Sequence, residues 1–169
     1  MRKPTIVSML LSTAILQAVS PAQALQVAAP NEAASAFSSA VSRFVAELDV
    51  ETEAFSVRIN RCQGKAGEFS DAIYYVRVGW RGVARAENAG KTLSALRTHW
   101  AASNWRITRD RDLENGGVNI AAIEPITGNT YSLDSGFDAG PTRYIVGYFG
   151  TPCLTSPTHP APFGAWSTP

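Results

Sequence analysis

The two histidines of the chain, His99 and His159, are the first residues to test for nucleophilic catalysis. A Ser or Cys nucleophile needs a base beside it and a third group that orients the base. His99 lies in a segment of helical spacing, His159 lies in a Pro-rich segment, and no Gly-x-Ser-x-Gly motif occurs. The sequence therefore disfavours a serine or cysteine hydrolase.

Acidic residues are the remaining candidates for acid–base chemistry. The pairs that stand close together in the chain are Glu51/Glu53, Asp110/Asp112 and Asp134/Asp138. Hydrolysis of a glycosidic bond needs two neighbouring carboxyl groups, with the pKa of one raised by burial. Each pair stands beside polar or turn-like sequence, which favours solvated charge. A small extracellular hydrolase using Asp110, Asp112 or Glu124 is retained as an alternative function.

Neither a metal nor a cofactor is predicted. Asp134 and Asp138, with Glu124, offer oxygen ligands for calcium, but their spacing is not that of an EF-hand loop. The Gly-Lys-Thr sequence at 90–92 ends like a phosphate-binding loop. That loop also needs a glycine at position 85, where this chain has Arg85.

Basic and acidic residues are unevenly distributed, although the whole chain has 15 Lys+Arg against 14 Asp+Glu. Residues 77–111 hold eight basic and two acidic residues, whereas residues 112–138 hold five acidic and no basic residues. Residues 32–54 are also acidic, with five acidic residues and one arginine. The near-neutral total disfavours a nucleic-acid-binding protein, and the basic middle segment favours an acidic partner.

The long strand predicted over 72–85 concentrates this charge on one of its faces. Its even positions are Tyr74, Val76, Val78 and Trp80, which look buried. Its other face carries Tyr75, Arg77, Arg81 and Arg85. We predict that these four residues form a contact surface for an unknown protein or an anionic envelope polymer. In the alternative interpretation, neighbouring strands pair these arginines with acidic residues and leave no basic patch.

Apolar spacing predicts the elements that position this strand. It indicates helices over 32–48, with Asn31 as a candidate N-cap, and over 87–103. Alternation predicts strands over 55–60, 72–85, 105–108, 118–122, 131–137 and 144–149. Asn-Gly-Gly at 115–117 and two further turn signals make the late strands antiparallel. The order α-β-β-α-β-β-β-β predicts an α+β two-layer sandwich, with two helices on one face of an antiparallel sheet.

The first 24 residues contain the three parts of a secretory signal peptide in order. Arg2 and Lys3 precede an apolar run over 6–16, and an Ala-x-Ala cleavage site ends at Ala24. The apolar run is too short to cross a bilayer, which takes about 20 residues. No later stretch is apolar enough to do so. We therefore expect a secreted protein, cleaved near Ala24, with no membrane span.

An exported chain with two cysteines predicts one disulfide bond, between Cys62 and Cys153. This bond brackets most of a single folded domain, which we expect over 32–153 after a linker at 25–31. Four prolines in 154–169 favour an extended C-terminal tail.

Several short motifs accompany this layout. They are Tyr-Tyr-x-Arg-x-Gly-Trp at 74–80, Asn-Trp at 104–105 and Thr-Pro-Cys at 151–153. Together with the signal peptide and the helix predicted over 32–48, whose apolar residues lie along one face, these motifs resemble those of small exported proteins and lipoproteins of actinobacteria. The resemblance covers residues 32–153. The chain departs from the lipoproteins because no cysteine follows its cleavage site. The resemblance implies export, and it brings neither a catalytic residue nor a substrate.

The leading hypothesis is a secreted, non-enzymatic binding protein that uses the basic face of its sheet. The carboxylate hydrolase is one alternative. A protease inhibitor acting through an exposed loop at Ala139–Thr142 is another.

Overall fold

The computed structural model describes residues 25–64, 66–139 and 141–167, which form two α-helices and eight β-strands. In chain order these elements are α1 (Pro30–Ala46), β1 (Glu51–Gln63), β2 (Phe69–Arg85), α2 (Ala86–Ala102), β3 (Arg106–Asp112), β4 (Val118–Ile123), β5 (Thr130–Ala139), β6 (Thr142–Gly150), β7 (Leu154–Thr155) and β8 (Gly164–Trp166). The predicted order of elements as far as β6, and the α+β class, are confirmed. The predicted signal peptide lies outside the described residues.

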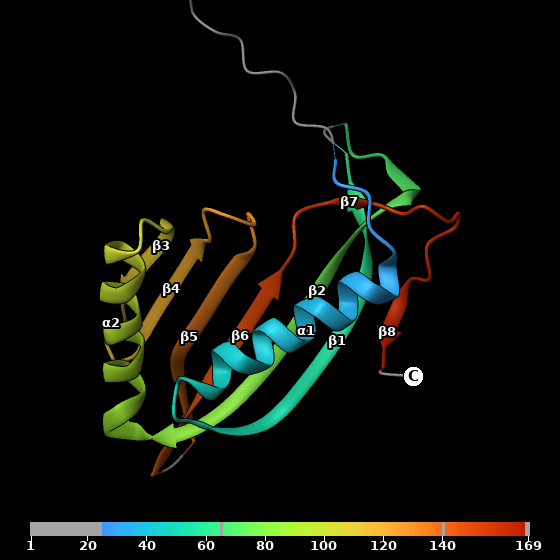
Figure 1. The fold of residues 1–169 in the computed structure, drawn as a ribbon. Coiled ribbons are helices and arrows are strands. Elements are labelled where there is room, and N and C mark those ends of the chain that lie inside the picture. Colours follow the sequence, from blue (N-terminus) through green and yellow to red (C-terminus); the bar gives the residue numbers. More distant parts are fainter. Residues whose placement is uncertain (1–24, 65, 140, 168–169) are drawn as a thin grey trace, which may run out of the picture.

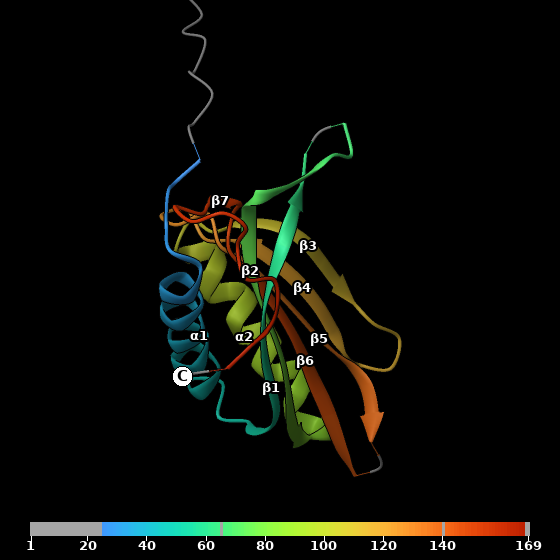
Figure 2. The same cartoon turned by 90° about the vertical axis from the view of Figure 1, so that its right-hand side faces the viewer.

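The eight strands form one sheet in the order β3-β4-β5-β6-β2-β1-β8, and β7 pairs with β2 beside this path. Every pair of neighbouring strands is antiparallel. Both helices lie against the same face of the sheet (Figure 1), and a side view shows no helix on the other face (Figure 2). The predicted two-layer arrangement is therefore confirmed, and one face of the sheet, here called the open face, is left to solvent.

The helix-covered face takes the apolar residues because side chains alternate between the two faces of a strand. The buried residues of β2 on this face are Tyr74, Val76, Val78 and Trp80. They belong to one core with the buried residues of the helices, Ala34, Phe37, Val41 and Val45 of α1 and Ala89, Leu93 and Trp100 of α2. Complete burial of a large apolar side chain stabilises the fold by about 1.5–3 kcal/mol. Alternation in the sequence therefore decides which residues of β2 reach the open face.

Five aromatic rings join both helices to the sheet. The ring of Trp100 stacks on that of Trp105 with centroids 5.1 Å apart, and Trp105 lies 4.9 Å from Tyr131. Phe44 and Phe149 meet Tyr131 edge-on at 5.0 and 5.5 Å. Such pairs add about 0.5–1.5 kcal/mol each beyond the area that they bury. The cluster holds α1 and α2 against the middle of the sheet.

Helix α1 starts at Pro30, two residues before the predicted start, and it also ends two residues early. Proline suits the first turn of a helix, because its missing N–H has no partner to lose there. Asn31 therefore lies inside the helix, and the prediction that it is the N-cap is wrong. The N-cap is Ala29, which makes no side-chain hydrogen bond to the helix.

The C-terminal segment is docked on the sheet, whereas its prolines predicted an extended tail. β7 pairs with β2 and β8 pairs with β1. Between these strands, the backbone N–H of Ala161 donates to the carbonyl of Asp71 at 2.9 Å. Proline removes a hydrogen-bond donor and so keeps both strands short, but it does not prevent docking. The folded domain therefore extends past Cys153 to Trp166.

The predicted disulfide is confirmed. Cys62, near the end of β1, is bonded to Cys153 in the connection between β6 and β7, with the two Cα atoms 6.0 Å apart. The bond holds the beginning of the C-terminal segment beside the end of β1. Neither helix in the described part of the chain is long and apolar enough to cross a membrane.

Loss of the disulfide should destabilise the domain. The bond joins residues 91 positions apart, and the chain-entropy model assigns a loop of this length about 4–5 kcal/mol. We expect the double substitution Cys62→Ala and Cys153→Ala to lower the free energy of unfolding by about 2–5 kcal/mol, as measured by urea denaturation. A thiol assay on the purified, unreduced protein should detect no free cysteine. An unchanged urea midpoint in the double variant would contradict this role of the bond.

The stability of the domain should fall at alkaline pH. Burial raises the pKa of Tyr74 and of Tyr131 above the ordinary value of 10.0, and Glu32 and Glu124 respectively raise it further. Because the unfolded chain loses these protons first, the contribution is fully present below about pH 10 and is lost as pH rises through the folded-state values. Urea denaturation at stepwise increasing pH measures the decline. Tyr131→Phe should make the decline shallower, and an identical slope in that variant would exclude Tyr131 as a cause.

Candidate functional site

The open face of β2 carries three of the four residues predicted as a contact surface. Tyr75, Arg77 and Arg81 alternate with the buried residues of β2 and so project away from the helices. Arg85 lies apart from them, as the residue that precedes the first turn of α2. There it borders a depression of about 540 Å³ together with Lys91 and the connection between α1 and β1.

Strand register brings two further residues beside Tyr75 and Arg77. Arg58 of β1 lies directly opposite Arg77, and Asn60 of β1 lies directly opposite Tyr75. Directly opposite residues in an antiparallel pair project from the same face, with their Cβ atoms about 4.5–5.5 Å apart. Arg58, Asn60, Tyr75 and Arg77, here called the β1–β2 cluster, therefore stand together on the open face.

No acidic residue in the described part of the chain forms an ion pair with Arg58 or Arg77. The guanidinium of Arg77 instead lies over the ring of Tyr148, 4.6 Å from its centroid. Arg81 differs, because it forms an ion pair with Glu53 at 2.7 Å and also lies over Tyr144. The alternative interpretation, in which acids neutralise the basic face, thus holds for Arg81. It does not hold for the two arginines of the β1–β2 cluster.

The two other members of the cluster have unused hydrogen-bond donors. The side-chain Nδ2 of Asn60 is buried and has no hydrogen-bond partner among the described residues. The hydroxyl of Tyr75 makes no hydrogen bond within the same part of the chain. A buried donor without a partner costs about 1–3 kcal/mol. The cluster therefore combines two cations that have no ion pair with two neutral donors that make no hydrogen bond among the described residues. This composition suits an anionic or oxygen-rich ligand.

A shallow depression of about 510 Å³ adjoins the cluster. Arg58, Asn60 and Tyr75 border it from the cluster, and Phe69 and Phe163 add aromatic rings. Phe69 is 61% exposed, and Phe163 lies beneath the guanidinium of Arg61 at 4.4 Å. The cluster thus lies against a shallow, mostly polar depression that two phenylalanine residues border.

The carboxylates considered for a hydrolase have other partners in the structure. Asp110 and Asp112 form ion pairs with Arg97 at 2.8 and 2.7 Å, and both remain solvated. The hydrogen bond from Arg97 to Asp112 raises the pKa of Arg97. Glu124 accepts a hydrogen bond from the hydroxyl of Thr127. These contacts do not bring the three carboxylates together.

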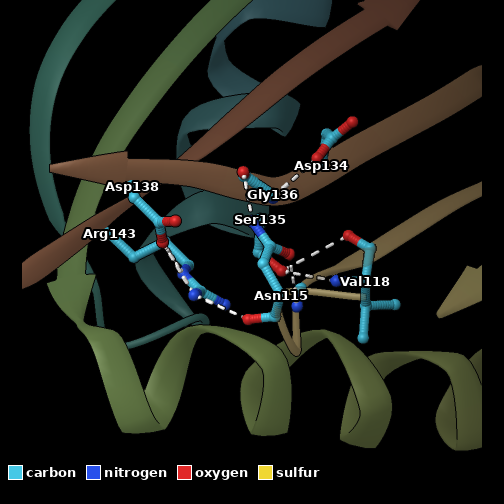
Figure 3. A network of polar contacts seen from close by, with 8 residues as sticks. Asn115, Val118, Asp134, Ser135, Gly136, Asp138 and Arg143 are labelled. Atoms are coloured by element: carbon cyan, nitrogen blue, oxygen red, sulfur yellow. Dashed lines mark hydrogen bonds and ion pairs between the residues drawn. The ribbon is translucent and has the colours of Figure 1, made fainter. Parts of the chain in front are cut away.

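Ser135, a fully buried hydroxyl, closes a break in the sheet rather than facing a ligand (Figure 3). The register of β5 against β6 shifts between Asp134 and Phe137, which is a β-bulge. The Oγ of Ser135 accepts a hydrogen bond from the N–H of Val118 at 2.9 Å and donates to the carbonyl of Val118 at 3.3 Å. The bulge also turns Phe137 outward to 51% exposure, although it stands two residues after the fully buried Ser135.

The polar network around Ser135 uses two of the three carboxylates that were considered for calcium, Asp134 and Asp138. Arg143, which is largely buried, forms an ion pair with Asp138 at 2.7 Å and donates to the carbonyl of Asn115 at 2.8 Å (Figure 3). Asp134 accepts a hydrogen bond from the N–H of Gly136 at 2.7 Å. Among the described residues no three His, Cys, Asp or Glu side chains gather as metal ligands. The network therefore fixes the turn between β3 and β4 against β5 and β6.

Sequence reasoning missed Arg58, Asn60 and Tyr148 as parts of the site. The alternation around Val57 and Ile59 already placed Arg58 and Asn60 on one face of their strand. Only the register shows which residues of β2 they oppose, and only strand order places Tyr148 of β6 beside Arg77. Comparisons of this chain with family models, with curated proteins and with solved structures find no match.

Removing the hydroxyl of Ser135 should destabilise the sheet without affecting the cluster. Ser135→Ala leaves the buried N–H of Val118 without its partner, so we expect a loss of about 1–3 kcal/mol in the free energy of unfolding. Ser132→Ala is the matched control, because Ser132 lies on the open face of the same strand without a hydrogen bond to another described side chain. Equal unfolding free energies for the two variants, measured in urea, would show that Ser135 does not close the bulge.

Proposed function

We propose that this protein is an exported, non-enzymatic binding protein that holds an anionic group of its partner on the open face of the sheet. The β1–β2 cluster is the contact site, and the partner is a protein or an envelope polymer that carries acidic groups. The observation that supports this proposal is the direct opposition of Arg58 and Arg77 without an acidic residue between them.

Opposed like charges cost stability, and a bound anion would relieve that cost. Two like charges directly opposite each other in a sheet are destabilising, on the scale of about 0.2–1 kcal/mol found for cross-strand pairs. Elsewhere on the molecule, Arg61, Arg97 and Arg143 have acidic partners within 2.8 Å, and Arg111, which has no ion pair among the described residues, lies opposite the neutral Asn119. Retention of a destabilising pair is typical of a site kept for function.

The aromatic neighbours suit such a site. Tyr148, which is 50% exposed, stacks against Arg77 and holds the guanidinium in place while its N–H groups remain free for a ligand. A planar guanidinium can bind a carboxylate with two parallel hydrogen bonds. Preorganisation of this kind lowers the entropy cost of binding.

Export is the second part of the proposal. The disulfide is compatible with an oxidising compartment, since such bonds are rare in the cytosol. The signal-peptide pattern of the first 24 residues and the resemblance to exported actinobacterial proteins both favour this location. N-terminal sequencing of the protein recovered from culture fluid tests it. The expected result is a chain that begins at Leu25.

The proposal predicts that binding and stability change in opposite directions when the arginine pair is broken. Arg58→Gln and Arg77→Gln should each weaken binding to an anionic polymer by about tenfold, because a charge-assisted hydrogen bond to the polymer is lost. Each substitution should leave the melting temperature unchanged or raise it, since the like-charge opposition disappears. Calorimetric titration with polygalacturonate and with polyglutamate at low ionic strength measures the affinity.

Arg111→Gln is the matched control for this experiment. Arg111 lies on β3 opposite Asn119, on the same face of the sheet, and has no ion pair within the described residues. The substitution Arg111→Gln removes one positive charge at the far edge of the sheet, so its effect on the affinity should be small. An equal loss of affinity for all three variants would show a general charge effect and contradict a defined site. If neither polymer bound to the protein, the proposal would also be overturned.

A further inference from the structure

Resting on the proposed function, we infer that the depression beside the β1–β2 cluster is a subsite for one ring of an acidic polysaccharide. Arg58 binds the carboxylate of the sugar ring. Asn60 and Tyr75 donate hydrogen bonds to its hydroxyls, and Phe69, at the start of β2, packs against the apolar face of the next ring of the same polysaccharide. The ligand class is therefore a uronate-type carbohydrate.

The aromatic walls of the depression indicate a ring-shaped ligand with an apolar face. Phe69 is 61% exposed at the start of β2, and Tyr75 is half-buried six residues further along the same strand, so the two border different ends of the depression. An exposed aromatic ring next to a cation offers apolar contact area and a charge to the same ligand. A pyranose carboxylate presents both features, because its C–H groups form an apolar face and its acid lies at the rim of the ring.

The two donors without hydrogen bonds, on Asn60 and Tyr75, indicate a ligand that carries hydroxyl groups as well as charge. Two arginines suffice for a simple anion, and neutral donors are not needed for that purpose. The amide nitrogen of Asn60 is buried without a hydrogen-bond partner in the described part of the chain, and Asn60 borders the depression, so rotation of its amide toward a ligand there would satisfy this donor. The hydroxyl of Tyr75 is likewise without a hydrogen bond to a described residue. A sugar supplies hydroxyls that accept from both groups.

The position of β8 disfavours an acidic peptide as the ligand. Extended peptides bind at exposed sheet edges through main-chain hydrogen bonds. At Arg58 both sides of β1 are already paired, with Arg77 of β2 on one side and Ala165 of β8 on the other. A ligand at this site must therefore be recognised by side chains, which suits a carbohydrate better than a strand.

Further cation–aromatic pairs continue the site along the open face. Arg77 lies over Tyr148 and Arg81 lies over Tyr144, with centroid distances of 4.6 and 4.9 Å. The two arginines are four residues apart on β2, which corresponds to about 13 Å along a strand. A polymer with one ring in the depression can follow β2 toward Arg77, which has no ion pair among the described residues, and then toward the ring of Tyr144, since Glu53 already pairs with Arg81. The site is thus suited to several rings of one chain rather than to a single monosaccharide.

The test compares three ligands, tetragalacturonate, polyglutamate and the neutral maltotetraose, by calorimetric titration of the mature, disulfide-bonded protein. Tetragalacturonate should bind, and maltotetraose should bind at least tenfold more weakly because Arg58 then has no acid to bind. Phe69→Ala should weaken tetragalacturonate binding by about tenfold while leaving the affinity for polyglutamate unchanged. Arg58→Gln should weaken the binding of both anionic ligands.

Phe55→Ala is the matched control, because Phe55 is also an exposed aromatic residue but lies opposite the buried Trp80, on the face of the sheet that the helices cover. It should leave all three affinities unchanged, and the near-ultraviolet circular dichroism of each variant confirms that it is folded. Equal binding of tetragalacturonate and polyglutamate, with no effect of Phe69→Ala, would overturn the saccharide subsite and leave the proposed anion site standing. Equal binding of maltotetraose would overturn the role of Arg58. Failure of both anionic ligands to bind would overturn the two proposals together.

Discussion

The burial of only one face of the sheet is the constraint on which the rest of this structure depends. Both helices lie on that face, so the strands send most of their apolar residues to that side and most of their polar residues to the other. In β2 this sends Tyr74, Val76 and Val78 into the core and leaves Tyr75 and Arg77 on the open face. A shift of register by one residue would exchange the two sets, so the core that stabilises the domain also fixes the position of the cluster.

The open face is not electrostatically uniform, because ion pairs neutralise its cations selectively. Arg81 has Glu53 beside it, and Arg97, on the helical side, is shared between two aspartates. Arg58 and Arg77 are left facing each other. The difference between the ion-paired arginines and the opposed pair Arg58 and Arg77 locates the site, which the net charge does not. A nearly neutral chain can still carry uncompensated charge at a place where two strands pair residues of like charge. The polar network around Ser135, in contrast, satisfies its own donors and acceptors and serves the fold.

The C-terminal segment determines what kind of partner this site can accept. β8 covers the outer edge of β1 from Val57 to Ile59, and the disulfide holds the beginning of the segment in place. Without β8, the edge of β1 beside Arg58 would offer main-chain groups to an extended peptide. With β8 in place, recognition at Arg58 falls to side chains. The same segment contributes Phe163 to the depression, so the residues that close the edge also help to shape the subsite.

Local pattern in the sequence determined the fold class, the order of elements, the disulfide and the face on which Tyr75, Arg77 and Arg81 lie. These follow from alternation, helical spacing and the presence of just two cysteines, which are properties of neighbouring residues or of simple counts. The tertiary structure alone decided that Arg58 opposes Arg77, that Arg81 is neutralised, that Arg85 lies apart and that the Pro-rich segment completes the sheet. Those outcomes depend on strand register and on pairings between residues far apart in the chain. Such pairings are set by the packing of the whole core, so no local pattern in the sequence contains them.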